Sequence, residues 1–236
     1  RPDEGSLGAV EEGPVHRGVD GVQVGRELVG QARQPRVVGV DVAAVARSPF
    51  RCVMLAKTES AHQLDKLAQV DGLQVIALIE TPLGAVNVNE IAAHPRCIGL
   101  MWGAEDLVAA MGGRSSRFAD ATYRDVPRHV RSATRLAAAA HGKFALDAVH
   151  IDIADTEGLA AEAEDAVALG FAATVCIHPS QSAVIRAAYR PTDDEIAWAR
   201  EVLEAEAGNN GVYQVRGRMI DAPLLAQARA IVARAD

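Results

Sequence analysis

Two acidic side chains that could share a metal ion follow consecutive apolar runs of the sequence. Glu80 directly follows the run Gln74–Ile79, and Asp106 follows the run Cys97–Trp102 after three residues. Working residues in parallel α/β folds sit at the carboxyl ends of strands, and neighbouring strands lie about 5 Å apart. Two strand-end carboxylates can therefore reach one ion, and Mg²⁺ is usually held by one or two carboxylates with waters and substrate oxygens. Each carboxylate could instead cap the helix that follows it.

Basic side chains gather in the stretch after Asp106. The glycine-containing loop 112–117 carries Arg114 and Arg117, and four more arginines follow at helical spacing, at positions 124, 128, 131 and 135. Such a concentration of positive charge suits an anionic tail such as a nucleotide phosphate. A solvated helix face with pairs three or four residues apart is the alternative for the later arginines. Glu105, beside Asp106, is either a supporting group of the site or a solvated acid.

Histidines and aspartates on two other apolar runs give weaker signals. His178 directly follows the run 172–177, where it could donate to a substrate or bond a backbone carbonyl. His150 and Asp152 share one face of a predicted strand, a pattern too common to indicate a metal site. We expect these two residues, and Asp147, to lie in the core or to support neighbouring groups.

The elements that must position these residues alternate between apolar runs and helical patterns from residue 51 on. Strands that are apolar on both faces and separated by helices indicate a parallel sheet covered on both sides. Such a series is either an open doubly wound sheet or a (β/α)8 barrel. No Gly-x-Gly-x-x-Gly follows the first strand, so dinucleotide binding has no support. We expect strands over 52–57, 74–80, 97–102, 144–153 and 172–177, and helices over 60–70, 84–93, 123–141, 157–169, 181–188, 193–207 and 223–235.

Composition narrows the class of protein. Of the 236 residues, 49% are hydrophobic and 23% charged, close to the globular average, and one large domain or two small ones fit this length. The net charge of −7 provides no basic field for nucleic acid or anionic lipid. No apolar run is long enough for a membrane span and no signal peptide stands out, so we expect a cytoplasmic protein. Three cysteines in apolar runs predict buried, reduced thiols (Cys52, Cys97 and Cys176).

Four strings of the sequence resemble one known family. They are VIALIETPLGAVNVNEIAAHPR, GLMWGAEDLVAAMGG, YRDVPRHVRSATRLAAAAHGKFALDAVHIDI and TVCIHPSQ. They are similar to the citrate lyase beta subunit-like (CitE-like) proteins of the HpcH/HpaI aldolase superfamily, especially the mycobacterial, actinobacterial branch, over residues 52–236. The resemblance implies a (β/α)8 TIM-type barrel of the phosphoenolpyruvate-binding kind that assembles as a homotrimer. It also implies Mg²⁺ on Glu80 and Asp106.

The family's C-terminal segment crosses to a neighbouring subunit and delivers an aspartate into its active site. The string MIDAP at 219–223 matches that motif, which makes Asp221 the candidate catalytic residue. An N-cap followed by Pro223 in the first helical turn is the alternative for Asp221. We therefore expect a barrel domain over 51–208 and a C-terminal segment over 209–236 that contacts a neighbouring subunit.

Residues 1–50 depart from the family. They hold eight of the twenty glycines and eleven valines without a clear period, although 36–42 could form one strand. The family has an acidic Leu-Asp-Leu-Glu-Asp motif and a Val-Arg-Ile-Asn strand in this part, and the arginine of that strand grips the substrate carboxylate. Neither motif is present. We interpret 1–50 as an atypical N-terminal segment, either mis-framed, divergent or truncated.

The resemblance implies a Mg²⁺-dependent carbon–carbon lyase that cleaves or forms a β-hydroxyacyl-CoA, with an acyl-CoA and a small keto acid as partners. Candidate substrates are citramalyl-CoA, malyl-CoA and 3-hydroxy-3-methylglutaryl-CoA. Asp221 would transfer the proton, and Arg114, Arg117 and Glu105 are candidate substrate-binding residues. Two alternatives remain open. One is a barrel without catalysis that serves as a binding or assembly subunit, and the other is a citrate lyase beta subunit that acts on a carrier-bound thioester.

Overall fold

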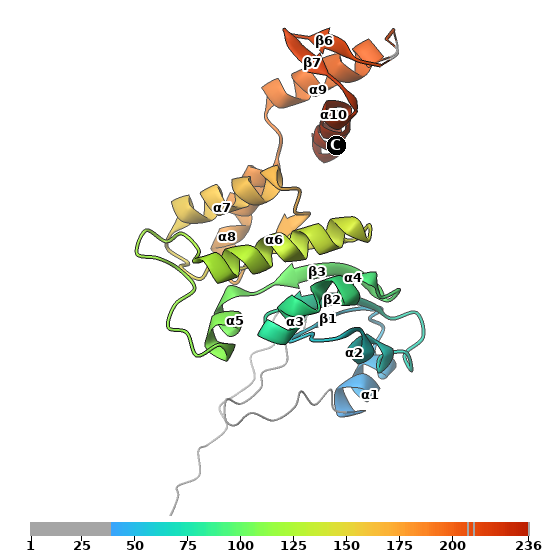
Figure 1. The fold of residues 1–236 in the computed structure, drawn as a ribbon, viewed down its shortest axis with the longest axis vertical. Helices are drawn as coiled ribbons and strands as arrows, with labels where there is room; N and C mark the ends of the chain where they lie inside the picture. The colour runs from blue at the N-terminus through green and yellow to red at the C-terminus, as the bar shows by residue number, and fades with distance from the viewer. Residues whose placement is uncertain (1–38, 207, 210, 236) are drawn as a thin grey trace, which may run out of the picture. The chain divides into compact units, whose positions relative to one another are not determined.

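A computed structural model describes residues 39–206, 208–209 and 211–235 (Figure 1). Most of the atypical segment 1–50 therefore lies outside the described residues. The strand expected over 36–42 is wrong where it is described, because Gly39–Arg47 form helix α1. Val42 and Val45 face the core at helical spacing, and the alanines around them are strong helix formers.

Five parallel strands form one sheet in chain order. Each strand pairs with the next one along the chain, which is how consecutive βα units are arranged in a (β/α)8 barrel. The sheet confirms the predicted parallel α/β architecture. The strands are β1 (Cys52–Leu55), β2 (Gln74–Ile79), β3 (Cys97–Trp102), β4 (Phe144–Asp147) and β5 (Ala173–Thr174).

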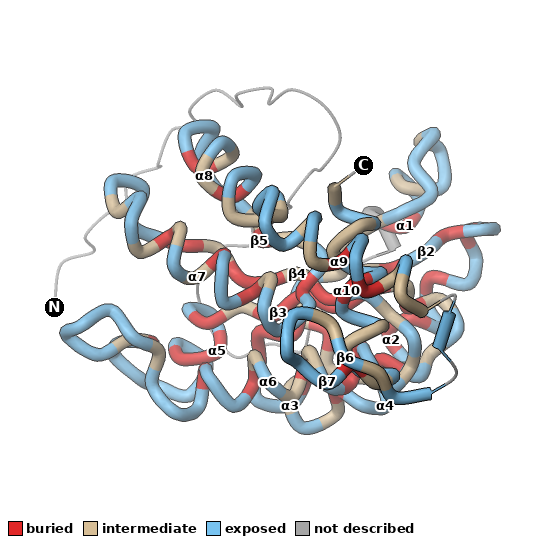
Figure 2. The backbone as a smooth tube through the Cα atoms, turned by 90° about the horizontal axis from the view of Figure 1, so that it is seen from above, coloured by how far each residue is buried: buried red, intermediate tan, exposed pale blue. Residues whose placement is uncertain are grey.

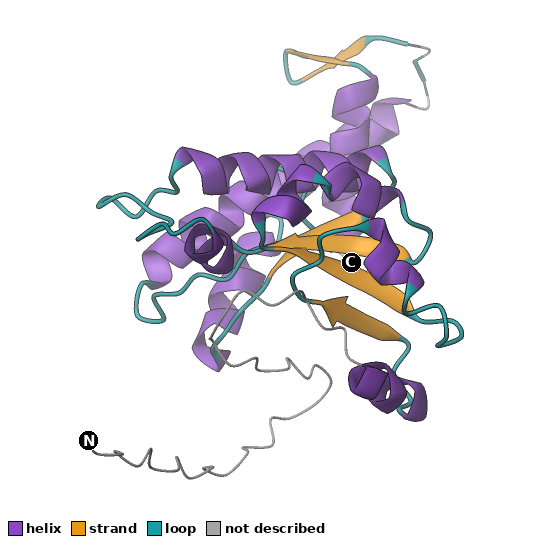
Figure 3. Cartoon of the chain, turned by 60° about the horizontal axis from the view of Figure 1, so that its bottom comes forward, coloured by secondary structure: helices purple, strands orange, loops and turns teal. Residues whose placement is uncertain are grey.

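Helices connect the strands and pack on the sheet (Figure 3). Helix α4 contacts β2 and β3, and α6 contacts β3 and β4. The predicted helix over 84–93 is split in two at Asn87, and a short helix after β3 was not predicted. The connecting helices are α2 (Ala61–Asp65), α3 (Pro82–Val86), α4 (Val88–Ala93), α5 (Ala104–Ala110), α6 (Asp125–Ala140), α7 (Thr156–Ala168) and α8 (Pro179–Tyr189).

The main core is built on the sheet and the faces of the helices that cover it. Figure 2 shows buried residues gathered along the strands. Trp102 is fully buried at the end of β3, with Leu100 and Ile79 beside it in the same core cluster. The Trp102 ring meets Tyr123 edge-on, with the ring centroids 5.1 Å apart. A buried aromatic pair of this kind fixes the end of β3 near the predicted site.

A second, smaller hydrophobic cluster involves only the last elements of the chain. It buries Ala199, Val202, Ile220 and Ala228. These elements are α9 (Asp193–Glu206), the antiparallel strands β6 (Tyr213–Val215) and β7 (Arg218–Ile220), and α10 (Ala222–Ala235). Hydrophobic contacts thus group α9 with the C-terminal segment that we predicted to start at 209. The role of this segment at a neighbouring subunit stays a prediction.

Two cysteines differ from the expectation. Cys97 is buried as predicted, but Cys52 and Cys176 are exposed, because they lie at the first residue of β1 and beyond the end of β5. None of the described helices combines the length and the apolar character needed to cross a bilayer.

Candidate metal and substrate site

Glu80 and Asp106 meet at the carboxyl ends of two paired strands. Ile79 at the end of β2 lies opposite Trp102 at the end of β3. The Gly103 N–H donates to the Ile79 carbonyl at 2.9 Å, which extends the pairing into the site. Lys57 contacts both acids, because its backbone N–H donates to Glu80 and its ammonium pairs with Asp106. The charge of Asp106 is near enough to raise the pKa of Glu80. The two predicted metal ligands are therefore brought together.

The Glu80 carboxylate lies in a tight enclosure. Its side chain is nearly buried, and its Oε1 accepts the Lys57 backbone N–H at 3.0 Å. A Cβ atom on Gly103 would come within 3.1 Å of the Glu80 Cβ and 3.2 Å of its Oε2, so the absence of a side chain at 103 makes this position possible. Burial raises the pKa of Glu80, and the nearby charge of Asp106 raises it further, against the opposing Lys57 hydrogen bond.

Asp106 is more open. Its side chain is 55% exposed, and the Lys57 ammonium lies 3.4 Å from its Oδ1. Neither acid caps the helix that follows it. The Thr81 hydroxyl caps α3 by accepting the Gly84 N–H at 3.1 Å, and Gly103 occupies the N-cap position of α5. The carboxylates of Glu80 and Asp106 are thus left for another partner.

The donor set fits a hard divalent cation. Within the described ranges, no cluster of three or more His, Cys, Asp or Glu side chains could hold a metal. The carboxylates of Glu80 and Asp106 offer oxygen ligands, and water and substrate would complete the coordination, as is usual for Mg²⁺. The burial and the neighbouring charge that raise the pKa of Glu80 are offset when a cation binds its carboxylate.

The loop after α5 is attached to the rest of the fold by its own side chains. The Ser116 hydroxyl donates to Glu105 Oε1 at 2.5 Å. The Arg117 guanidinium pairs with Glu162 and lies 3.8 Å from the centroid of the Tyr123 ring. Arg117 would therefore have to share or exchange this partner to bind a phosphate. Arg114 is exposed and has no ion pair among the described residues, so its side chain is available for an anion.

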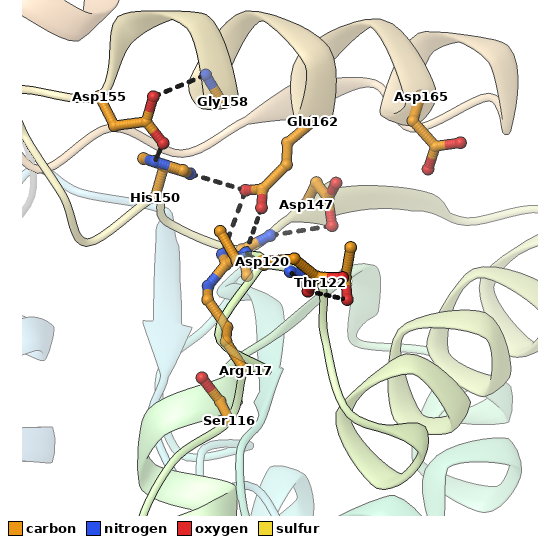
Figure 4. Close-up of polar contacts among 12 residues, drawn as sticks. Ser116, Arg117, Asp120, Thr122, Asp147, His150, Asp155, Gly158, Glu162 and Asp165 are labelled. Atoms are coloured by element: carbon orange, nitrogen blue, oxygen red, sulfur yellow. Dashed lines mark hydrogen bonds and ion pairs between the residues drawn. The ribbon is translucent and has the colours of Figure 1, made fainter.

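A partly buried polar network anchors the same loop to α7 (Figure 4). His150 bonds Glu162 through Nδ1 at 2.9 Å and Asp155 through Nε2 at 3.2 Å. The Gln181 amide donates to the His150 carbonyl at 2.8 Å. The Glu162 carboxylate therefore joins Arg117 to His150. The expectation that His150 supports neighbouring groups from the core is confirmed.

Asp147 has a similar structural role at the end of β4. It accepts the Trp102 indole N–H at 2.6 Å and three hydrogen bonds from Arg131, which also pairs with Asp165. Burial alone would lower the pKa of Arg131, but the bonds to Asp147 and Asp165 outweigh it and raise the pKa. The arginines of α6 are thus not one solvated face. Arg131 and Arg135 contact the neighbouring elements, and Arg128 pairs with Asp125 on the helix.

The remaining candidates lie at helix starts. His178 caps α8, because its Nδ1 accepts the Ser180 N–H at 3.2 Å. Asp221 Oδ1 accepts the Leu224 N–H at 3.4 Å at the start of α10, in line with the expected N-cap. Asp221 also lines a cavity of about 520 Å³ together with Glu206 and Tyr213. Its delivery to a neighbouring active site stays a prediction.

Sequence reasoning assigned no role to Lys57. Its backbone bonds Glu80 and its side chain pairs with Asp106, so it is the third residue of the site. The available signal was its position just after an apolar run, which is the signal that identified Glu80.

Carboxylates at the ends of consecutive parallel strands are typical of metal-dependent α/β barrel enzymes. The chain belongs to the HpcH/HpaI aldolase/citrate lyase family, whose model matches residues 31–179. It is 53% identical to a citrate lyase subunit beta-like protein of Mycobacterium tuberculosis over 206 residues, which is 87% of this chain and 73% of that protein. The resemblance found in the sequence is therefore confirmed.

Two other relatives are more distant. A (3S)-malyl-CoA thioesterase of Cereibacter sphaeroides is 32% identical over 204 residues, covering 83% of this chain and 69% of that protein. A mitochondrial citramalyl-CoA lyase of Rattus norvegicus is 32% identical over 173 residues, covering 68% and 50%. Both names describe enzymes that act on acyl-CoA thioesters.

The fold matches a solved structure of the family. CitE of Mycobacterium tuberculosis, in complex with magnesium, acetoacetate and coenzyme A, superimposes with a TM-score of 0.77 at 53% identity. The match covers 83% of this chain and 72% of that one. The predicted α/β fold class of the TIM-barrel kind is thereby confirmed.

Proposed function

We propose that this protein is a Mg²⁺-dependent carbon–carbon lyase. It would cleave a β-hydroxyacyl-CoA into an acyl-CoA and a small keto acid, or form the β-hydroxyacyl-CoA in the reverse reaction. The observation that carries the proposal is the convergence of Glu80 and Asp106 at the ends of β2 and β3. Family membership supports the same chemistry, and the related CitE structure contains magnesium, acetoacetate and coenzyme A.

Glu80 and Asp106 would hold the ion through their carboxylate oxygens. A divalent cation bound there would act as a Lewis acid toward the carboxylate and hydroxyl oxygens of the acid fragment. Cleavage requires that a base remove the hydroxyl proton, that the bond between the two carbons break, and that the leaving thioester enolate gain a proton at carbon. Asp221 of a neighbouring subunit is our candidate for the donor that protonates the enolate. A homotrimer is therefore part of the proposal.

The loop after α5 offers candidate residues for binding the coenzyme. Arg114 is exposed on this loop, and a CoA phosphate would gain a charge-assisted hydrogen bond there. Arg117 and Glu105 stay proposed substrate-binding residues, with Ser116 and Glu162 holding them in place.

The experiment is a lyase assay with citramalyl-CoA, malyl-CoA and 3-hydroxy-3-methylglutaryl-CoA, with and without Mg²⁺. We expect turnover of at least one substrate that depends on Mg²⁺. Glu80→Gln or Asp106→Asn should abolish this dependence and the binding of Mg²⁺ measured by calorimetry. Asp125→Asn, which changes an exposed acid that pairs only with Arg128, is the matched control. Retained Mg²⁺ activation in both site variants would contradict the assignment.

A thioesterase is the second candidate, because one relative is named a (3S)-malyl-CoA thioesterase. The two activities give different products. Hydrolysis of a thioester releases a free thiol, which a thiol reagent detects, whereas carbon–carbon cleavage leaves the thioester intact and releases a keto acid. A folded protein that binds Mg²⁺ but releases neither product would favour a binding or assembly subunit, and turnover of a carrier-bound thioester alone would favour a citrate lyase beta subunit.

A further inference from the structure

One residue contacts both carboxylates of the site through different atoms. The Lys57 backbone N–H donates to Glu80 Oε1 at 3.0 Å, and its ammonium lies 3.4 Å from Asp106 Oδ1. In the part of the chain that the structure describes, no other ion pair includes Glu80 or Asp106. Lys57 follows β1, so the three residues come from the ends of three consecutive strands.

The backbone of Lys57 is in an unfavourable conformation. Its φ is +51°, in the left-handed region that glycine adopts freely and residues with a side chain avoid. Hydrogen bonds of the next residue hold this turn, since the Thr58 N–H donates to the Leu78 carbonyl at 3.1 Å and its hydroxyl to the Leu55 carbonyl at 2.6 Å. Backbone strain of this kind clusters at functional sites. A lysine at a position that suits glycine indicates that the ammonium has a use.

The ammonium is held loosely. The Lys57 side chain is 44% exposed, and an exposed pair at this distance is weak. A divalent cation on Glu80 and Asp106 would neutralise the charge that attracts the ammonium and would repel it. A carboxylate bound beside that cation would attract it instead, and the flexible lysine stem allows the head group to move between the two positions.

We propose that Lys57 binds the carboxylate of the acid substrate, and that its ammonium rests on Asp106 until a divalent cation takes its place. This inference rests on the proposed function, because it requires metal binding at Glu80 and Asp106. It assigns the substrate carboxylate a partner that the sequence motifs of the chain had not provided.

The two halves of the proposal predict opposite effects of removing the ammonium. Without it, Mg²⁺ no longer competes with a nearby positive charge, and its affinity should rise about three- to tenfold at low salt. Pyruvate, used as a small keto acid probe, loses a charge-assisted hydrogen bond, and its affinity for the Mg²⁺-loaded protein should fall about tenfold or more.

Two variants separate the charge from the backbone. Lys57→Met removes the ammonium and keeps the strained side-chain-bearing backbone, whereas Lys57→Gly removes the ammonium and relieves the strain. Both variants should bind Mg²⁺ more tightly and pyruvate more weakly than the wild type in calorimetric titrations of the full chain. Their midpoints of thermal unfolding should differ, with the midpoint of the glycine variant higher. Lys57→Arg should restore pyruvate binding, and Lys66→Met, at an exposed lysine outside the site, should match the wild type in both titrations.

Each outcome of these titrations decides between the proposals. Unchanged or weaker Mg²⁺ binding in both Lys57→Met and Lys57→Gly, or unchanged pyruvate binding, would overturn the role of Lys57. If Glu80→Gln still abolished Mg²⁺ binding in that case, the proposed function would stand. A wild-type protein that binds no Mg²⁺ would overturn both.

Discussion

Gly103→Ala tests whether the Glu80 carboxylate keeps its position only because residue 103 has no side chain. Gly103 has an extended backbone with φ −134° and ψ 126°, which alanine adopts without strain, so any effect must come from space. The new Cβ would lie 3.1 Å from the Glu80 Cβ and 3.2 Å from its Oε2. Ordinary contacts begin at 3.4 Å, so Glu80 must move by about 0.3 Å.

This displacement is large for a metal ligand. Distances in a functional metal site stay within about 0.2 Å of their preferred values. Changes to groups that orient a metal ligand typically weaken metal binding by about tenfold to a hundredfold. We therefore expect Mg²⁺ to bind Gly103→Ala about tenfold more weakly, and overpacking to lower the free energy of unfolding by about 1 kcal/mol.

Calorimetric titration with Mg²⁺ and urea unfolding measure these two effects. Gly208→Ala is the matched control, because nothing lies within 4 Å of the Cβ that it adds. The control should bind Mg²⁺ like the wild type. Wild-type Mg²⁺ affinity in Gly103→Ala would refute the reasoning, because Glu80 would then hold its position without the space at 103.

Three further outcomes concern the network, the proton donor and the acidic pair. Arg131→Met leaves the buried Asp147 carboxylate without its main partner and should lower the free energy of unfolding, measured in urea, by about 3 kcal/mol. Arg128→Met, at an exposed arginine, should change it by less than about 0.5 kcal/mol. Equal losses in the two variants would contradict a buried role for Arg131. Asp221→Asn should slow lyase turnover about a hundredfold with Mg²⁺ affinity unchanged, and an unchanged rate would leave Asp221 as a helix cap. Because the pKa of folded Glu80 is raised, its ionisation costs stability above that pKa and the cost disappears as the pH falls through it. Metal-free Glu80→Gln should therefore unfold at a higher temperature than the wild type at pH 8 but not at pH 4, and a difference independent of pH would argue against this cause.

The strand ends that carry the site could be predicted because their signal is local. An apolar run followed by an acid fixes both the strand and the exit of the chain from it, as at Glu80. The two last strands were predicted too long. Residues 148–153 are as apolar as a strand, but β4 ends at Asp147, and His150 beyond it bonds the side chains of Glu162 and Asp155.

The partners of the arginines could not be read from spacing. Arg128, Arg131 and Arg135 repeat every three or four residues, which describes their position on a helix and nothing about the neighbouring surface. Arg131 finds two acids on other elements, and Arg135 donates to the Leu169 carbonyl at 2.9 Å. Such pairs join residues 16 to 34 positions apart, and only the packing of α6 on the sheet brings them together.

The position of Lys57 shows how register decides the chemistry of the site. Leu55 at the end of β1 lies opposite Ala77, two residues before the end of β2, while Ile79 lies opposite Trp102. Strand β1 therefore stops early, and the turn at Lys57 crosses to reach Glu80 with its N–H. A shift of one residue in either pairing would reverse the direction of the side chains at the strand end. Glu80 would then no longer face both Lys57 and Asp106, and the carboxylate pair on which the proposed metal site depends would not form.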